Sequence, residues 1–162
     1  MAETLSVTDM LPNKFEPKRK FRWVLAIEGI DAFLLKSASR PSISISSQEI
    51  PFINSRRYIA GKHSFGTMSV TLHDPIAPSA AQQVMEWIRT HSESVSGRAG
   101  YADFYKRDIQ LKMLDPVGTV VELWDIKGAF ITEANFGDLD YSTEDPSDIS
   151  LTLQMDNCVL QY

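Results

Sequence analysis

The sequence predicts a mainly β protein, an antiparallel β-barrel or sandwich of about eight strands with one α-helix. Many segments alternate apolar and polar residues, which is the period expected when one face of a strand is buried. Turn-forming residues, such as those at 115–118, separate these segments at hairpin spacing. A single segment has helical spacing instead. Because barrels and sandwiches both deal with exposed strand edges, either architecture suits this pattern.

The length and the first twenty residues define the expected domain organisation. A chain of 162 residues is within the usual range for one domain. Pro12 and Pro17 break any helix near the N-terminus, and four bases between positions 14 and 20 favour a solvated chain. We therefore expect an extended N-terminal arm over residues 1–20 and a single β-barrel domain over residues 21–162. The arm is either a frayed terminus or a segment ordered by a neighbouring subunit.

The expected strands follow the arm in chain order. Residues 21–27 alternate, a turn follows at 29–31, and residues 32–38 form the next strand, so these two strands should pair as a hairpin. Residues 119–126 are apolar on both faces, which is typical of a central strand. Further strands are expected at residues 42–46, 67–73, 108–113 and 149–156, and residues 128–132 either continue the strand at 119–126 or start another.

One helix is expected to begin after Pro78. Ser79 and Gln82 have the spacing of a capping box, and Val84 and Trp87 fall on one helical face together with Ile88 and His91. That face should pack against the barrel or close its end. The expected core residues are Trp23, Trp87, Trp124, Leu151 and Leu153.

Residues 47–66 have no single clean period. They combine apolar side chains with the bases Arg56, Arg57 and Lys62. The segment is too long for a hairpin loop and too apolar for a free linker, and such segments usually make contacts elsewhere. We expect a protruding interface loop, and the alternative is a two-stranded excursion packed on its own barrel.

The sequence lacks the patterns of an enzyme or a metal protein. The three histidines do not have the spacing of a zinc site, and the single cysteine, Cys158, is expected to be a buried, inert thiol. There is no nucleophile elbow and no glycine-rich phosphate loop. The paired carboxylates between positions 138 and 145 lie in a polar loop, where solvation is expected rather than acid–base catalysis. We therefore expect no catalytic residue, no metal, no cofactor and, because the apolar stretches are short, no membrane insertion.

Charge is unevenly distributed along the chain. The net charge is −5, and residues 128–162 contain seven acids and no Lys or Arg. An acidic chain is poorly suited to gripping nucleic acid, which requires a concentrated basic surface. A chain with one slightly basic part and one strongly acidic part is suited to head-to-tail stacking on copies of itself.

Three strand faces carry short, uncharged polar side chains. Solvent-exposed strand faces usually carry Lys and Glu, so faces that avoid long charged side chains suit a subunit contact or the wall of a channel. The alternative is an ordinary solvent face, since Ser and Thr are tolerated in strands. The three rows are Ser42, Ser44 and Ser46; Thr67, Ser69 and Thr71; and Ser150, Thr152 and Gln154.

Several stretches resemble the tail tube proteins of T4-like contractile-tailed phages. The segment 54–74 resembles the family signature, the helix with its Trp resembles the single tube helix, and residues 126–141 and 149–153 resemble the last two strands and the loop between them. The resemblance covers roughly residues 20–162 and is collinear. The signature positions fall on Asn54, Arg56 or Arg57, Ala60-Gly61, Phe65, Val70-Thr71-Leu72 and Asp74.

The resemblance implies a structural subunit of the inner tube of a contractile phage tail. In that family, hexameric rings stack into a hollow tube inside a sheath, and DNA passes through the lumen without specific binding. The implied partners are other copies of the chain, the tail sheath protein, and the baseplate and tail terminator proteins. The implied location is the virion, after assembly in the host cytoplasm.

The resemblance also suggests roles for particular residues. Ring-to-ring contacts are expected at Phe52, Asn54, Arg56, Arg57, Tyr58, Lys62, Lys18 and Arg19. The lumen or an inter-subunit wall is expected to include Ser69, Thr71, Ser150, Thr152 and Gln154. Two alternatives remain open: the inner tube of a type VI or extracellular contractile injection system, and a β-barrel that binds a small ligand.

Overall fold

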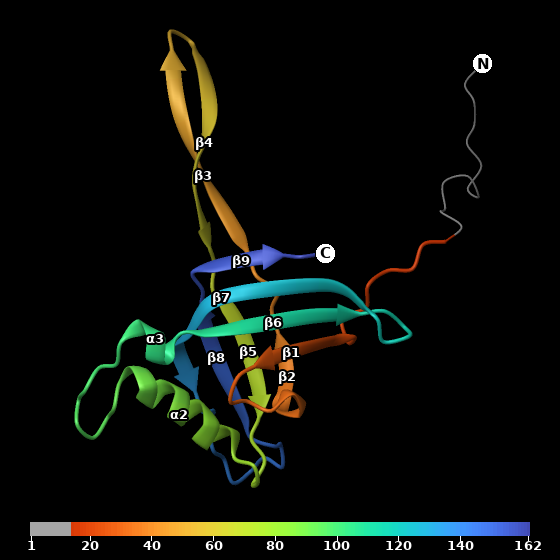
Figure 1. Cartoon of the computed structure of the whole chain (residues 1–162), viewed down its shortest axis with the longest axis vertical. Coiled ribbons are helices and arrows are strands. Elements are labelled where there is room, and N and C mark those ends of the chain that lie inside the picture. Colours follow the sequence, from red (N-terminus) through yellow and green to blue (C-terminus); the bar gives the residue numbers. More distant parts are fainter. Residues whose placement is uncertain (1–13) are drawn as a thin grey trace.

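The computed structural model describes residues 14–162, which form a mainly β fold with one main helix (Figure 1). Residues 1–13, most of the expected arm, lie outside the described residues. The predicted fold class is confirmed, with nine strands in the described part of the chain rather than about eight. The elements are β1 (Trp23–Ile27), η1 (Ala32–Leu34), β2 (Leu35–Ala38), β3 (Ile43–Phe52), β4 (Ser55–Phe65), β5 (Met68–His73), α2 (Ala80–His91), α3 (Ala102–Tyr105), β6 (Arg107–Leu114), β7 (Val120–Asn135), β8 (Asp148–Gln154) and β9 (Asn157–Leu160).

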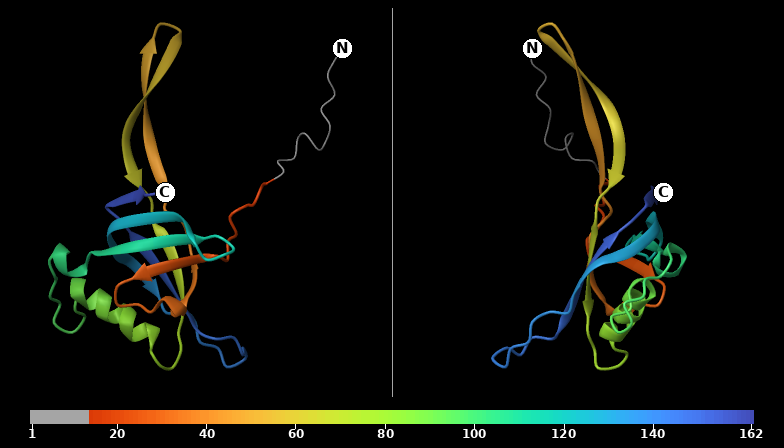
Figure 2. Two further views of the ribbon diagram at one scale, coloured as in Figure 1. Left: turned by 45° about the vertical axis from the view of Figure 1, so that its right-hand side comes forward. Right: turned by 90° about the vertical axis from the view of Figure 1, so that its left-hand side faces the viewer.

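Seven of the strands form one antiparallel sheet that folds into two layers. The strand order is β1-β6-β7-β8-β5-β2, with β9 beside β7. Figure 2 shows β1 and β6 in one layer, and β8 and β5 in the other. The arrangement is therefore sandwich-like, and the hydrophobic core lies between the layers.

The long strand β7 belongs to both layers. Its first half pairs with β6 on one edge and with β9 on the other, and residues 130–135 pair with β8. Gly128 lies between these halves with φ of 66°, and a Cβ atom there would come within 2.3 Å of Asp156 Oδ2. Glycine therefore permits both the left-handed backbone and the close approach of the chain between β8 and β9.

The core is made by the alternating apolar positions that the sequence marks. In β5 and β8 every second residue is buried, and these residues meet side chains from β1 and β6 across the core. The helix α2 adds Ala80, Val84 and Trp87 at the end of the sandwich opposite the long hairpin (Figure 1). Leu151 and Leu153 are buried, whereas Trp23 and Trp124 are half-buried and pack against the edge of the core.

The start of α2 differs from the expected capping box. Ser79 is the N-cap residue, but its side chain makes no capping hydrogen bond. Asp74 Oδ1 instead accepts a hydrogen bond of 3.3 Å from the backbone N–H of Ala81. A carboxylate there satisfies one of the free N–H groups of the first turn and lies favourably at the positive end of the helix dipole.

The expected hairpin between residues 21–27 and 32–38 is wrong. β1 pairs with β6, and β2 pairs with β5, so consecutive strands lie in different layers. The short η1 helix between them buries Leu34 and carries the chain across the core. A two-residue turn would have held the strands side by side, but this longer connection separates them.

The expected interface loop at 47–66 is also different in form, because it is a β-hairpin. β3 and β4 pair with each other over nearly their whole length and extend far from the sandwich (Figures 1 and 2). A backbone hydrogen bond of 2.9 Å from Gly66 N to Ser42 O closes the base of this hairpin, between β3–β4 and the β2–β5 pair that continues from it. The segment protrudes, as predicted, and it is not packed on its own barrel.

Candidate assembly surfaces

The β3–β4 hairpin exposes an unusual amount of apolar surface. All ten residues of β3 and all residues of β4 except Phe65 are exposed. A two-stranded hairpin is marginally stable in water by itself, and a large exposed apolar patch usually marks a contact surface. The large apolar side chains exposed on it are Ile43, Ile45, Ile50, Phe52, Ile53, Tyr58 and Ile59.

The tip of the hairpin contains a strained residue. Ile53 has φ of 50° and is 87% exposed. A β-branched side chain rarely adopts this left-handed conformation, which Gly or Asn would adopt at lower cost. Strain of this kind concentrates at functional positions, and here it holds a large apolar side chain at the outermost point of the fold.

The two faces of the hairpin carry different side chains. The strand register places Ile50, Phe52 and Arg57 on one face, because Ile50 is opposite Arg57. The other face carries Tyr58 and Arg56, and the Arg56 guanidinium lies 3.1 Å from Glu49. The expected ring-contact residues of this segment, Phe52, Asn54, Arg56, Arg57, Tyr58 and Lys62, are therefore all exposed on the hairpin or its turn.

The described end of the arm is attached to the body through a buried carboxylate. Glu122 on β7 is 4% exposed and forms an ion pair with Lys18 of the arm. Arg40, just before β3, lies 3.4 Å from the same carboxylate, and the Trp124 indole N–H donates a hydrogen bond to it. One side chain thus joins the arm, the base of the hairpin and the central strand. Arg19 is exposed, with Glu16 3.9 Å away.

These contacts lower the pKa of Glu122. Burial alone raises the pKa of a carboxyl group, but the hydrogen bonds from Lys18 and Trp124 and the charges of Lys18 and Arg40 outweigh it. A carboxyl group with a lowered folded-state pKa stabilises the fold above its unfolded pKa. That stability is lost as the pH falls through the lower folded value.

Replacing Glu122 with glutamine is expected to lower stability at neutral pH, with a smaller difference from wild type in acid. The difference should narrow as the pH falls from about 4.5, the ordinary pKa of this group, because the wild-type carboxylate then becomes protonated. Thermal unfolding measured by circular dichroism between neutral and acid pH tests this. Glu144→Gln is the control. If the melting midpoint of Glu122→Gln differed from that of the wild type by the same amount at every pH, the lowered pKa of Glu122 in the folded state would be refuted.

The outer face of the β2-β5-β8-β7 layer carries a row of short polar side chains. Across the strands, Ser69 lies opposite Thr152, and Thr71 lies opposite Ser150. Figure 2 shows the helix on the other side of this layer, so the outer face is not covered by α2. Gln154 belongs to the same face, but its amide donates a hydrogen bond of 3.2 Å to Phe65 O at the base of the hairpin.

A small charged cluster lies at the end of this face away from the hairpin. Asp148 forms an ion pair with Lys36, and its Oδ1 lies 3.3 Å from His73 Nδ1. The hydrogen bond from Lys36 is the main cause of the lowered pKa of Asp148. The cluster joins β2, β5 and β8 at their ends, which is a structural role.

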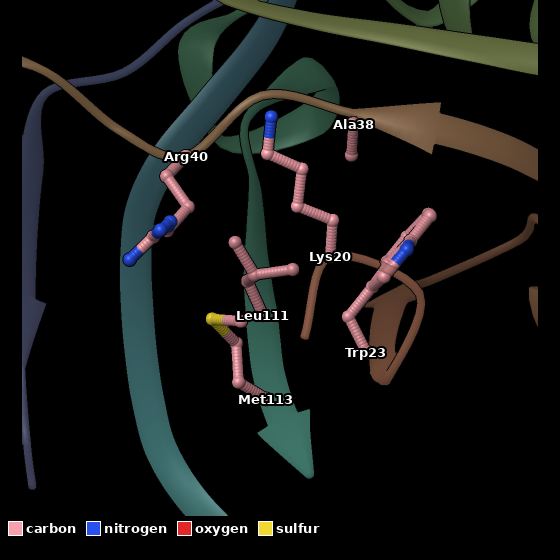
Figure 3. Close-up of a pocket in the computed structure, with 6 residues that line it drawn as sticks. All are labelled: Lys20, Trp23, Ala38, Arg40, Leu111 and Met113. Carbon is pink, nitrogen blue, oxygen red and sulfur yellow. The ribbon is translucent and has the colours of Figure 1, made fainter. Parts of the chain in front are cut away.

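A cleft of about 300 Å³ lies between β1, β6 and β2 (Figure 3). Lys20 and Arg40 provide its charge, and Trp23, Leu111 and Met113 provide its apolar wall. It lies where the two layers meet without pairing, next to the site where the arm attaches. Within residues 14–162 no group of three or more His, Cys, Asp or Glu side chains could hold a metal ion. None of the helices there has the length and hydrophobicity to cross a membrane.

Sequence reasoning missed Glu122 and Arg40, although one signal was present. Glu122 is the one charged residue at an inward position of an apolar strand, which by itself calls for a cationic partner. Its partners are 104 and 82 residues away in the chain. No local sequence pattern relates Lys18 and Arg40 to Glu122.

The fold described above is similar to the folds of solved tube proteins and of a tube-terminating cap. No family model matches the sequence, and no curated protein matches it significantly. A chain of the anti-feeding prophage cap, described as a tube-terminating cap, is 18% identical with a TM-score of 0.75, and the match covers 97% of this chain and 99% of that one.

Two further solved structures show the same fold. A chain of the PVC sheath–tube complex, an extracellular contractile injection system in its extended state, is 17% identical with a TM-score of 0.71 and coverage of 98% and 99%. A chain of the SPP1 tail tube is 15% identical with a TM-score of 0.52 and coverage of 89% and 78%. At these identities the similarity establishes the fold, and it confirms the predicted resemblance to tail tube proteins at that level.

Proposed function

We propose that this chain is a structural subunit of the inner tube of a contractile phage tail. Copies form hexameric rings, and the rings stack into a hollow channel for DNA delivery. The observation that carries this proposal is the outer face of the β2-β5-β8-β7 layer, which carries a row of short uncharged polar side chains and whose two edges are unpaired within residues 14–162. The chain is a component of the virion, assembled in the host cytoplasm, and is not an enzyme.

The strand directions allow neighbouring copies to form one closed sheet. Within residues 14–162, no strand pairs with the outer edge of β2 or with the second edge of residues 130–135 in β7. The four strands of this layer alternate in direction, so β2 of one copy and β7 of the next are antiparallel. An even number of alternating strands in each copy lets a ring close without a mismatch, which removes both free edges.

The polar outer face suits the wall of a DNA channel. DNA carries about one charge per 1.7 Å of its axis, so a basic wall would bind it. Ser69, Thr71, Ser150 and Thr152 provide short uncharged side chains, and Glu133 opposite Thr152 adds a negative one. Such a wall lets DNA pass without being held. The hairpin and the arm, residues 1–20, then hold one ring to the next, with sheath and baseplate proteins as further partners.

Thiol labelling tests the orientation of this face. In a Cys158→Ala background, Ser150→Cys is expected to react readily with a bulky maleimide in unassembled protein and at least about tenfold more slowly in tubes, because the reagent must enter through the ends. Glu86→Cys on the exposed side of α2 should react equally fast in both states. Equal labelling of Ser150→Cys in tubes and subunits would contradict the lumen assignment.

Two related functions are separated by simple observations. A type VI or extracellular injection tube would have the same architecture but would carry protein instead of DNA. The match to the PVC sheath–tube complex favours this alternative. A tube-terminating ring is favoured by the match to the anti-feeding prophage cap. A terminator forms single rings that cap a tube, whereas a tube subunit forms stacks at high concentration.

A further inference from the structure

We propose that the loop of residues 136–147 is the docking site for the β3–β4 hairpin of a second copy in the next ring. This inference rests on the tube function proposed above. The loop is the receiving surface of the ring-to-ring contact, and its acidic and apolar side chains bind the basic and apolar side chains of the hairpin.

The two surfaces lie at opposite ends of the molecule. The hairpin extends from one end of the sandwich, and the loop between β7 and β8 projects from the other (Figures 1 and 2). A second copy displaced along the long axis therefore brings its hairpin toward this loop. A contact between two different surfaces of identical copies does not close on itself, so it propagates along a tube.

The charges of the two surfaces are opposite. The hairpin, residues 43–65, contains Arg56, Arg57 and Lys62 against one acid, Glu49. The loop contains four acids and no base: Asp138, Asp140, Glu144 and Asp145. Arg56 is already paired with Glu49, whereas Arg57 and Lys62 form no ion pair within residues 14–162. Their charges are available to a partner, and complementary charge fixes both orientation and register.

Both surfaces also carry exposed apolar side chains. Leu139 is 92% exposed and Tyr141 is fully exposed in the loop, while Phe52 is 69% exposed at the hairpin tip. Single exposed apolar residues are common, but here they occur beside the charged groups on each of the two opposing surfaces. The pairing of apolar with apolar and basic with acidic selects this chain as the partner.

The loop is internally ordered, which favours a preformed docking surface. Asp140 accepts hydrogen bonds of 2.9 and 2.8 Å from the backbone N–H and the hydroxyl of Ser142, and Asn135 Oδ1 accepts one of 2.9 Å from Gly137 N. Ser147 O accepts a hydrogen bond of 3.2 Å from Asp74 N. A preformed loop loses less conformational entropy on binding than a disordered one.

A charge-swap experiment tests the pairing. The hairpin variant is Arg57→Glu with Lys62→Glu, and the loop variant is Glu144→Lys with Asp145→Lys. Asp140 is left unchanged because it orders the loop. Each variant is expected to raise the concentration needed for tube assembly, measured by sedimentation at low ionic strength, about tenfold or more. Combining the two variants should restore assembly to near the wild-type concentration.

Matched controls separate this pairing from net charge and from folding. Arg89→Glu with Arg98→Glu, and Glu86→Lys with Asp103→Lys, change net charge equally on other exposed surfaces and should leave assembly unchanged. The melting midpoint of each variant shows whether it is folded. If Glu144→Lys with Asp145→Lys does not fold, Glu144→Gln with Asp145→Asn is used in its place.

The possible failures are distinguishable. If the wild type forms tubes but the loop variant assembles normally, or the combination does not recover, the hairpin docks elsewhere and the tube function stands. If the wild type forms neither rings nor tubes, the proposed function fails together with this inference.

Discussion

Replacing Trp87 with alanine is expected to destabilise the subunit by about 3–5 kcal/mol. Trp87 is 1% exposed, its indole N–H donates a hydrogen bond of 2.7 Å to Tyr105 O, and the Arg107 guanidinium lies 4.6 Å from its ring centre. Alanine would leave a cavity between α2 and the core, an unpaired carbonyl and a half-buried cation without its aromatic neighbour. Urea denaturation followed by circular dichroism measures the change in the free energy of unfolding.

Two further variants make this test specific. Trp87→Phe fills most of the cavity but cannot donate the hydrogen bond, so we expect a smaller loss of stability. Phe104→Ala removes an exposed ring near the same helix and should have little effect. An unchanged midpoint for Trp87→Ala would mean that α2 does not hold this end of the core.

Shortening the hairpin is expected to abolish ring stacking while leaving the subunit folded. Residues 46–62 would be replaced by Asn-Gly, which joins Ile45 to His63, a pair that is already opposite in the strand register. No residue of the hydrophobic core lies in the removed segment, so the melting midpoint should change by only a few degrees. Tubes should disappear in negative-stain electron microscopy even at high protein concentration.

The control for this deletion removes exposed apolar side chains elsewhere. Val95 and Val117 are exposed in two other loops, and replacing both with serine should leave tube formation intact. Tubes of ordinary length formed by the shortened protein would show that stacking depends on other surfaces.

The elements predicted well from the sequence are those with one buried face. β5, β6 and β8 alternate because their inner residues fill the core, and α2 has a 3.6-residue period for the same reason. The β3–β4 hairpin has no clean period because neither of its faces is buried in the subunit. Apolar and polar residues alternate along a strand only when one of its faces is buried. A strand with both faces exposed therefore cannot be recognised from its periodicity.

The long-range contacts could not be predicted from local patterns. Whether β1 pairs with β2 or with β6 depends on how the chain crosses the core through η1, not on the strand sequences. The attachment of Lys18 to Glu122 likewise joins distant segments. The predicted protrusion is present, and the ring-contact candidates between Phe52 and Lys62 are exposed on it, while their role in ring contacts stays a prediction. Their arrangement on two opposite hairpin faces required the strand register.

Electron microscopy of the purified protein at high concentration tests the central claim most directly. We predict hollow tubes built of stacked six-membered rings, with the β2-β5-β8-β7 layer facing the lumen once the images are averaged. Single rings that never stack would instead support a tube-terminating ring. Protein that remains monomeric at all concentrations and salt conditions, with no rings, would contradict the account.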